Sequence, residues 1–224
     1  MTKLIELNQI SIFSEKKEII RDFNLEVEAG DFVAINGPSG SGKSTLLKLM
    51  AQLLSTNLSY SGEYILKGKD SKQWDPIKLR QTVSYCYQSP NLFGHTVYDN
   101  LNFPYAIRDE SFDEQRVLQY LENVKLDPSY LHKSIHELSG GEKQRIALVR
   151  NVQFQPDVLL LDEVTSALDN RTRLDIWEWL DQYRAENGTT FIMISHHDDQ
   201  QRAEKTVTIE KLTTRDKDKE EDHD

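Results

Sequence analysis

Residues 37–45 read Gly-Pro-Ser-Gly-Ser-Gly-Lys-Ser-Thr, which fits the phosphate-loop pattern Gly-x-x-x-x-Gly-Lys-Ser. The preceding residues 31–36, Asp-Phe-Val-Ala-Ile-Asn, form a short apolar run that is typical of a buried strand. Residues 45–51 have leucine and methionine side chains at helical spacing, so we expect a helix there. The motif requires a strand, a glycine-rich loop and a helix in this order. A plain glycine- and serine-rich turn before a helix is the simpler alternative, and this context argues against it.

Each residue type in the loop has its own physical use. The glycines permit backbone angles that a Cβ atom would forbid, so that successive N–H groups can point inward at an anion. The positive end of the following helix reinforces the site. Lys43 adds a full positive charge for the β- and γ-phosphates of a nucleotide, and the Ser44 hydroxyl is a candidate ligand for Mg²⁺. The predicted phosphate-binding set is Gly37, Pro38, Ser39, Gly40, Ser41, Gly42, Lys43, Ser44 and Thr45.

A second apolar run, residues 158–161, ends in the two carboxylates Asp162 and Glu163. Such a run suits a parallel strand buried on both faces, and ligands of parallel sheets bind beyond the carboxyl ends of the strands. Asp162 is therefore the candidate Mg²⁺ partner, and Glu163 the candidate general base for an attacking water. A solvated strand end is the alternative, which the phosphate loop upstream disfavours.

Residues 138–142 read Leu-Ser-Gly-Gly-Glu, and they can offer backbone N–H groups to a second phosphate at the start of another helix. Ser139 and Glu142 also have the spacing of a helix capping box, and the two uses are compatible. One nucleotide cannot lie close to both glycine-rich segments within a single copy of most such folds. The pair therefore predicts that two copies share each nucleotide.

Several further motifs occur in order along the chain. The stretch 82–88 ends in Gln88, and the segment 138–142 is followed by Lys-Gln-Arg-Ile-Ala-Leu. Residues 166–169 read Ser-Ala-Leu-Asp, and His196 follows the apolar run 191–195. Taken with the phosphate loop, they resemble the ATP-binding cassette (ABC) proteins.

A narrower resemblance, carried by residues 83–101, 144–151 and 163–169, is to the FetA-type iron-export ATP-binding subunits. Substrate choice in such systems resides in a different polypeptide, so other substrates and either direction of transport stay open.

The resemblance implies an α/β fold of the P-loop NTPase class, with a mixed central sheet, an N-terminal antiparallel β subdomain and a helical lobe. It implies one ATP-binding domain over residues 1–210, with the lobe at about 90–150. Residues 211–224 form an acidic tail that we expect to be disordered.

The resemblance also implies roles for single residues. Gln88 would contact Mg²⁺ or the attacking water, and His196 would touch the γ-phosphate as part of a catalytic set with Glu163 and Lys43. Asp169 would lie at the dimer seam. The implied metal set is Ser44, Gln88 and Asp162, and the segment that completes the partner's nucleotide site is Ser139, Gly140 and Gly141.

Two residues have an alternative interpretation. Phe13 lies where the family places an aromatic residue that stacks on adenine, but it could also be a half-buried strand residue. His196 and His197 suggest a metal site, but adjacent residues of an extended segment point apart. One departure from the family pattern is Val164, where proline is the usual residue after the glutamate.

Composition narrows the class of protein. The 224 residues are 38% apolar and 29% charged, and no apolar run approaches the roughly 18 residues that span a bilayer. No charged-then-apolar signal segment opens the chain, and a single cysteine, Cys86, fits a reducing compartment as a buried, inert thiol. The net charge of −10 argues against nonspecific nucleic-acid binding.

We therefore expect an ATPase that uses ATP and Mg²⁺ and forms a head-to-tail homodimer. We expect it to be peripheral on the cytoplasmic face of the membrane, where it powers an integral membrane permease. The segment 89–105, with Leu92, Phe93, Val97, Phe103 and Tyr105, is the expected contact with that partner, and an ordinary loop is the alternative. An ABC ATPase acting on ribosomes or DNA is a less favoured alternative, because this chain has neither a second cassette nor a long coiled coil.

Overall fold

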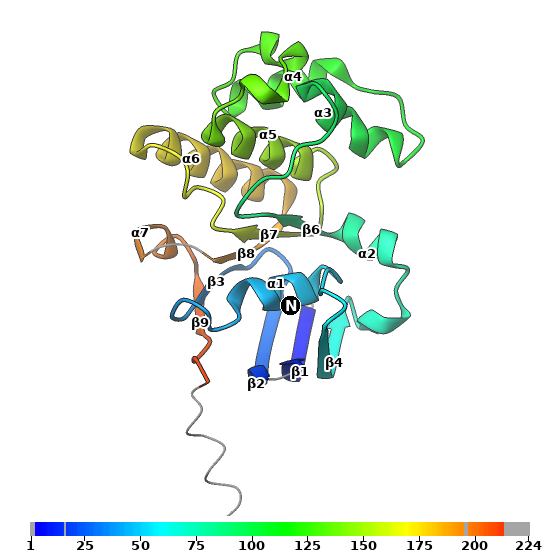
Figure 1. Cartoon of the computed structure of the whole chain (residues 1–224), viewed down its shortest axis with the longest axis vertical. Helices are drawn as coiled ribbons and strands as arrows, with labels where there is room; N and C mark the ends of the chain where they lie inside the picture. Colours follow the sequence, from blue (N-terminus) through cyan, green and yellow to red (C-terminus); the bar gives the residue numbers. More distant parts are fainter. Residues whose placement is uncertain (1–2, 16, 195–196, 213–224) are drawn as a thin grey trace, which may run out of the picture.

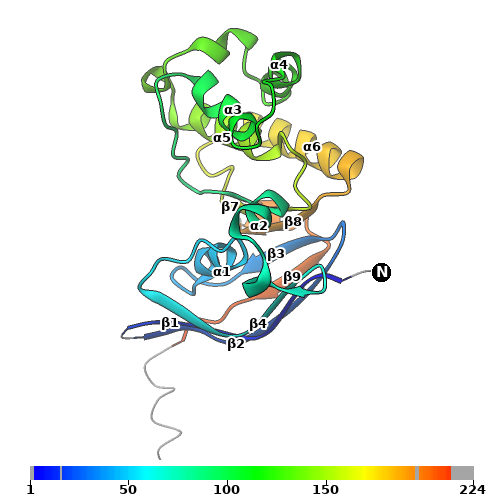
Figure 2. The ribbon, with the colours of Figure 1, turned by 90° about the vertical axis from the view of Figure 1, so that its right-hand side faces the viewer.

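The computed structural model describes residues 3–15, 17–194 and 197–212 of the chain, and for residues 197 and 198 it describes the backbone only. Figure 1 shows two sheets and a helical lobe arranged in layers, with one helix, α1, between the sheets. Figure 2 shows the same order of layers from the side. No helix among the described residues is long and apolar enough to cross a membrane.

The N-terminal sheet is antiparallel and has the strand order β2-β1-β4-β5. Its polar and apolar residues alternate along much of each strand, as expected for a sheet with one face on the core and the other in solvent. Its strands are β1 (Lys3–Ser14), β2 (Lys17–Glu28), β4 (Leu58–Leu66) and β5 (Lys69–Asp70).

The central sheet has the order β6-β7-β8-β3-β9, and each pair of neighbouring strands is parallel. The expectation of a mixed central sheet is corrected here, because the antiparallel strands pair only with one another and form a sheet of their own. The strands are β6 (Val83–Cys86), β7 (Val158–Asp162), β8 (Thr190–Ile194), β3 (Phe32–Asn36) and β9 (Lys205–Thr208).

The helices lie between the sheets and over the outer face of the parallel sheet, where the lobe is stacked (Figure 1). The α-helices are α1 (Lys43–Met50), α2 (Pro76–Thr82), α3 (Val97–Ala106), α4 (Glu114–Asn123), α5 (Gly140–Val152), α6 (Asn170–Asn187) and α7 (His197–Gln200). Short 3-10 turns are η1 (Ser71–Gln73), η2 (Pro128–His132) and η3 (Ile135–Glu137).

Two hydrophobic cores occupy the two faces of the parallel sheet. Val33, Ile35 and Leu160 belong to the core shared with α1 and the antiparallel sheet, whereas Leu159 and Leu161 belong to the core under the lobe. Successive strand residues point to opposite faces, so a strand covered on both sides needs a continuous apolar run. This is why the runs before Asn36 and Asp162 lack polar residues.

The predicted α/β fold is otherwise confirmed. In α6, Trp177 is buried and Trp179 is half-buried, whereas Leu174 is 54% exposed and does not belong to the apolar face of the helix. Cys86 is buried, and burial raises the pKa of its thiol to about 12, which fits the inert role predicted for it. The expected acidic tail lies outside the described residues from 213 onward.

Candidate nucleotide-binding site

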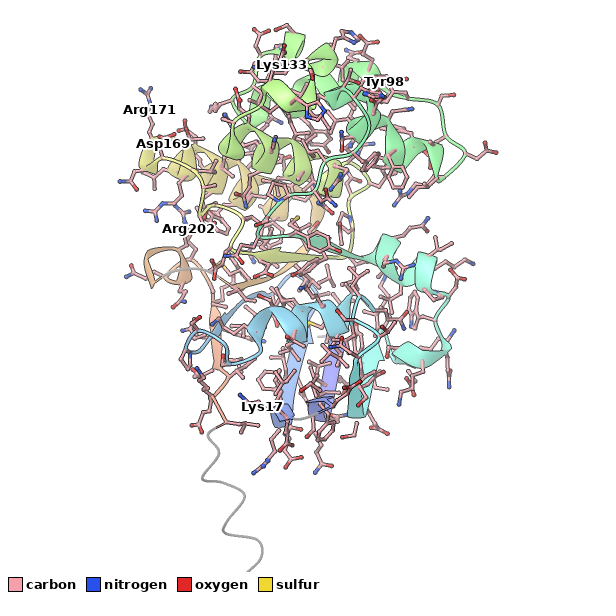
Figure 3. All side chains as sticks on the ribbon, in the orientation of Figure 1. Lys17, Tyr98, Lys133, Asp169, Arg171 and Arg202 are labelled. Atoms are coloured by element: carbon pink, nitrogen blue, oxygen red, sulfur yellow. The ribbon has the colours of Figure 1, made fainter. Side chains whose placement is uncertain are left out.

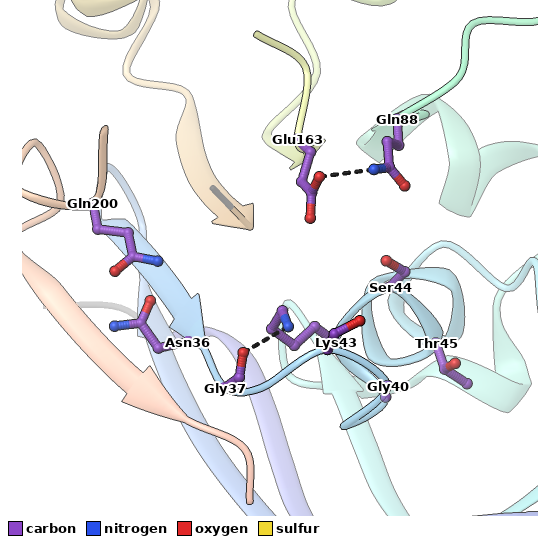
Figure 4. Close-up of a pocket in the computed structure, with 11 residues that line it drawn as sticks. Asn36, Gly37, Gly40, Lys43, Ser44, Thr45, Gln88, Glu163 and Gln200 are labelled. Carbon is purple, nitrogen blue, oxygen red and sulfur yellow. Dashed lines mark hydrogen bonds between the residues drawn. The ribbon is translucent and has the colours of Figure 1, made fainter. Parts of the chain in front are cut away.

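A cavity of 660 Å³ opens at the carboxyl ends of β3, β6 and β7. Figure 4 shows the glycine-rich loop on one side of it and Gln88 and Glu163 on the other. Segments far apart in the sequence thus meet at one edge of the parallel sheet, which is where such sheets bind ligands. The lining residues are Asn36, Gly37, Ser39, Gly40, Gly42, Lys43, Ser44, Thr45, Gln88, Glu163 and Gln200.

The glycines at the two ends of the loop are required by backbone angle and by space. Gly37 has φ 144°, and a Cβ atom there would lie 2.3 Å from the carbonyl oxygen of Ile209. Gly42 caps α1 with φ 96°, and a Cβ atom there would lie 2.8 Å from Ile19 and 2.9 Å from Ile20 of β2. The loop is therefore held between the antiparallel sheet and the segment after β9. A side chain at Gly37 would require a shift of the backbone, and one at Gly42 would displace the isoleucine side chains of β2.

The Lys43 ammonium group folds back over the loop. Its Nζ donates to the carbonyl oxygens of Gly37 at 2.8 Å (dashed in Figure 4) and Pro38 at 3.0 Å. Both acceptors are neutral, so an anionic phosphate oxygen in the cavity would be a stronger partner for this charge. Pro38 contributes only its carbonyl here, and the buried Ser41 lies beneath the loop, so neither lines the cavity.

Asp162 is buried at the end of β7 and accepts two hydrogen bonds from hydroxyl groups. Ser44 donates to Oδ1 at 3.0 Å, and Tyr85 donates to Oδ2 at 2.5 Å. Burial, and then the bond to Asp162, raise the pKa of Tyr85 above its usual range, so the phenol keeps its proton. Tyr85 was missed from the sequence, because only the register of β6 against β7 brings it to Asp162.

The Ser44 hydroxyl and the Asp162 carboxylate are suitable ligands for a magnesium ion. A serine hydroxyl and a carboxylate are the hard oxygen ligands that Mg²⁺ selects, usually together with phosphate oxygens and water. Among the described residues there is no cluster of three or more His, Cys, Asp or Glu side chains that could bind a metal on its own. The protein would therefore supply Ser44 and Asp162, with Gln88 nearby, and the nucleotide would supply the rest.

Glu163 and Gln88 lie side by side on the wall of the cavity opposite the glycine-rich loop. Gln88 Nε2 donates to Glu163 Oε2 at 2.7 Å (Figure 4). The Glu163 backbone has φ 49°, which is uncommon for a residue with a Cβ atom, and its N–H donates to the Ile194 carbonyl at 2.9 Å. Strained residues of this kind persist where their surroundings hold them. Gln144, which the sequence did not single out, donates to the carbonyl oxygens of both residues.

Ser139 caps α5 and forms the predicted capping box with Glu142. The pKa of the Glu142 carboxyl is lowered to about 2. The largest cause is the hydrogen bond from the Tyr130 hydroxyl, and the Ser139 N–H and the nearby Lys133 ammonium add smaller effects. This carboxylate fixes the first turn of the helix. Ser139 and Gly140 are exposed, and neither they nor Gly141 line the cavity of their own chain.

The remaining predicted site residues lie apart from the cavity. Phe13 is half-buried on β1 and does not line the cavity, so its stacking role stays a prediction. Asp169 is exposed and caps α6 through the N–H groups of Arg171 and Thr172, and Figure 3 shows Asp169 and Arg171 close together at one side of the molecule. His196 lies outside the described residues. Asn36 and Gln200, which line the cavity, were not predicted.

Comparisons with known proteins agree with this site. Residues 20–166 match the family model described as ABC transporter. The chain is 44% identical over 208 residues to the probable iron-export ATP-binding protein FetA of Escherichia coli (strain K12), covering 92% of this chain and 91% of that protein. It is 37% identical over 198 residues to the spermidine/putrescine import ATP-binding protein PotA of Spiroplasma citri, covering 87% of this chain and 55% of that protein.

Among solved structures, the chain resembles the dimeric, post-hydrolysis state of the ATP-binding cassette MJ0796 bound to ADP and phosphate. The TM-score is 0.82 at 26% identity, and the alignment covers 94% of this chain and 97% of that one. The family match, the close relatives and the cassette fold lead to one conclusion: this chain belongs to the ABC transporter family, as one of its ATP-binding subunits, and is an ATPase.

Proposed function

We propose that two copies of this chain bind head to tail around two Mg-ATP molecules and that ATP turnover drives a separate membrane permease. The observation that carries the proposal is the separation of the two glycine-rich segments. Residues 37–45 line the cavity, whereas Ser139–Gly141 begin a helix outside it with an exposed first turn. The dimeric state of the structurally similar cassette supports a shared site.

Within each site the side chains have separate roles in phosphoryl transfer. Lys43 would neutralise charge on the β- and γ-phosphates, and the magnesium ion held near Ser44 and Asp162 would supply further charge neutralisation. Glu163 would accept the proton of the attacking water, and Gln88 orients the Glu163 carboxylate through their hydrogen bond. His196 of the same chain, and Ser139 of the partner subunit, would contact the γ-phosphate.

Complementation between two inactive variants tests the shared site. Lys43→Ala removes the phosphate contact, and Ser139→Arg fills the helix start, so each homodimer should lack ATPase activity. A mixed dimer has one site with an intact loop from one chain and an intact Ser139 from the other. We therefore expect mixing to restore activity in proportion to the mixed dimer formed. No gain at any mixing ratio would contradict sharing between chains.

A groove of 390 Å³ between α2, α3 and the end of α5 is the proposed docking site for the permease. Its exposed apolar side chains include Ile77, Phe103 and Ile107. Phe93 is also exposed nearby, whereas Val97 and Tyr105, which the sequence led us to expect on this surface, are buried in the lobe core. The described residues that line the groove are Ile77, Arg80, Gln81, Ser84, Phe103, Pro104, Ile107, Arg108, Arg150, Asn151, Phe154 and Pro156.

Charge favours one kind of occupant for this groove. Arg80, Arg108 and Arg150 line it together with apolar side chains, and none of the described lining residues is acidic, although the whole chain carries a net charge of −10. A cytoplasmic segment of the permease with apolar side chains and a carboxylate fits this surface. Arg80→Glu should release the protein from the membrane fraction of its cells and leave the ATPase activity of the purified chain unchanged. Unchanged membrane retention would contradict this docking site.

Iron export is the proposed transport activity, and it rests on the resemblance to FetA at 44% identity over nearly the whole chain. The more distant relative, at 37% identity, is described as an import protein for polyamines, so the comparison favours export of iron over import. Cells that carry Glu163→Gln as their sole copy should accumulate iron, measured by elemental mass spectrometry. Unchanged cellular iron in that strain would contradict iron export without affecting the assignment as an ATPase.

A further inference from the structure

Gln144 joins three functional segments of the chain through one buried amide. Its side chain is 3% exposed, lies one helical turn into α5, and points to the loops that carry Gln88 and Glu163. Nε2 donates to the Gln88 carbonyl oxygen at 3.2 Å and to the Glu163 carbonyl oxygen at 3.5 Å. An amide nitrogen has two N–H groups, so both bonds can form at once.

The chemistry of the neighbours fixes the orientation of this amide. Both partners are carbonyl acceptors, so only the NH₂ end of Gln144 can face them. The Oε1 atom is buried and has no hydrogen-bond partner among the described residues. An unsatisfied buried acceptor opposes folding, so folding stability alone does not account for a glutamine at this position.

The two residues that Gln144 holds by their backbones also bond to each other by their side chains, at 2.7 Å. Glu163 also has the strained φ of 49°. Gln144 therefore fixes the separation of two loops whose side chains must meet the nucleotide and the attacking water. Because it does not line the cavity, it acts through Gln88 and Glu163 and not on the nucleotide.

The same helix begins at the segment proposed to contact the partner's nucleotide. Gly140 and Gln144 lie one turn apart on α5, about 6 Å along the helix axis at the usual rise. Docking of Ser139–Gly141 on the nucleotide of the partner would fix the position of α5. Through Gln144, it would also fix the general base that serves the chain's own nucleotide.

We propose that Gln144 is a positioning residue that couples the two ATP sites of the dimer. The proposal rests on the shared-site arrangement above. Nucleotide binding at one site fixes the position of the first turn of α5. The hydrogen bonds of the Gln144 amide then fix the loops that carry Gln88 and Glu163 at the other site. Hydrolysis is then cooperative in ATP, since filling the second site holds the general base of the first more firmly and raises the rate there.

Two substitutions test the role of the amide. Gln144→Met keeps the length of the side chain and removes both donors, whereas the isosteric Gln144→Glu places a carboxylate against two carbonyl oxygens. We expect kcat to fall about tenfold or more in Gln144→Met and further in Gln144→Glu, because misplaced catalytic groups cost one to two orders of magnitude in rate. The affinity of the nucleotide-free chain for ATP should not change, and the Hill coefficient for ATP should fall toward 1.

Tyr183→Phe is the matched control. It removes one buried hydrogen bond to the same helix, from the Tyr183 hydroxyl to the Val152 carbonyl at 2.9 Å, at the end far from the site. This variant should melt at a lower temperature and keep wild-type kcat and cooperativity. If Gln144→Met also keeps both, or if Tyr183→Phe loses both, the coupling role of Gln144 is wrong.

Measurements on the wild-type protein distinguish failure of the coupling role from failure of the proposed function. If wild-type ATP hydrolysis is not cooperative and the Lys43→Ala and Ser139→Arg variants fail to complement, the shared site itself is wrong, and the coupling proposal falls with it. If the wild type is cooperative and Gln144→Met is equally so, only the role of Gln144 is overturned.

Discussion

Replacing Glu163 by glutamine should stop ATP hydrolysis and leave ATP binding intact. The two side chains have the same shape, and a glutamine carbonyl oxygen can accept the hydrogen bond that Gln88 Nε2 now donates at 2.7 Å. The backbone strain at φ 49° and the bond from the Glu163 N–H to Ile194 are also unaffected. What the substitution removes is the proton acceptor.

The expected size of the effect follows from that single loss. A positioned general base contributes about 10²–10⁴ in rate, and each factor of ten corresponds to about 1.36 kcal/mol, so the barrier should rise by about 3–5 kcal/mol. Phosphate formation in a single turnover, with the enzyme in excess over Mg-ATP, measures this rate, and fluorescent-nucleotide titration measures the affinity.

Glu178→Gln is the control, because Glu178 is an exposed carboxylate of the same chain that lies on α6, and it should hydrolyse ATP at the wild-type rate. If Glu163→Gln hydrolyses ATP within about threefold of the wild-type rate, Glu163 is not the general base. If it loses ATP affinity as well, the substitution removes more than the proton acceptor, and the claim that ATP binding stays intact is wrong.

Three further substitutions test the site and its supports. Gly37→Ala should abolish ATP binding in a nucleotide titration, because its Cβ would lie 2.3 Å from the Ile209 carbonyl oxygen; binding at wild-type affinity would refute this. Tyr64→Phe loses the buried bond to the Met50 carbonyl that holds the end of α1, and calorimetry should show a loss of about 1 kcal/mol, or roughly 2–4 °C in Tm. The pKa of Glu142 is lowered to about 2, so its ionisation stabilises the fold above pH 4.5 and this stabilisation is lost as the pH falls toward 2. Urea unfolding should therefore show the wild type more stable than Glu142→Gln at pH 7, with the difference shrinking by pH 3; a constant difference would contradict the pKa.

Local patterns predicted most of the site. The phosphate loop, the carboxylates after β7 and the cap of α5 each occupy a short stretch in which residue type, backbone angle and function coincide. Gly37 and Gly42, for example, have positive φ angles, which suit the glycines that the motif places there.

The residues that were missed act through tertiary contacts. Tyr85 reaches Asp162 only through the register between β6 and β7, and Gln144 reaches Gln88 only through the rotation of α5. The burial of Val97 and Tyr105 likewise depends on how α3 packs in the lobe. No spacing within the sequence reports such contacts.

The sharing of nucleotide between two copies is tested most directly by the mass of the Glu163→Gln variant in solution, measured by light scattering during gel filtration. With saturating ATP and Mg²⁺ we expect a particle of twice the 26.0 kDa of one chain, and a single chain without nucleotide. Adding Ser139→Arg to this variant should prevent the dimer. A particle of 26.0 kDa under saturating ATP would contradict the claim that nucleotide is shared between two copies.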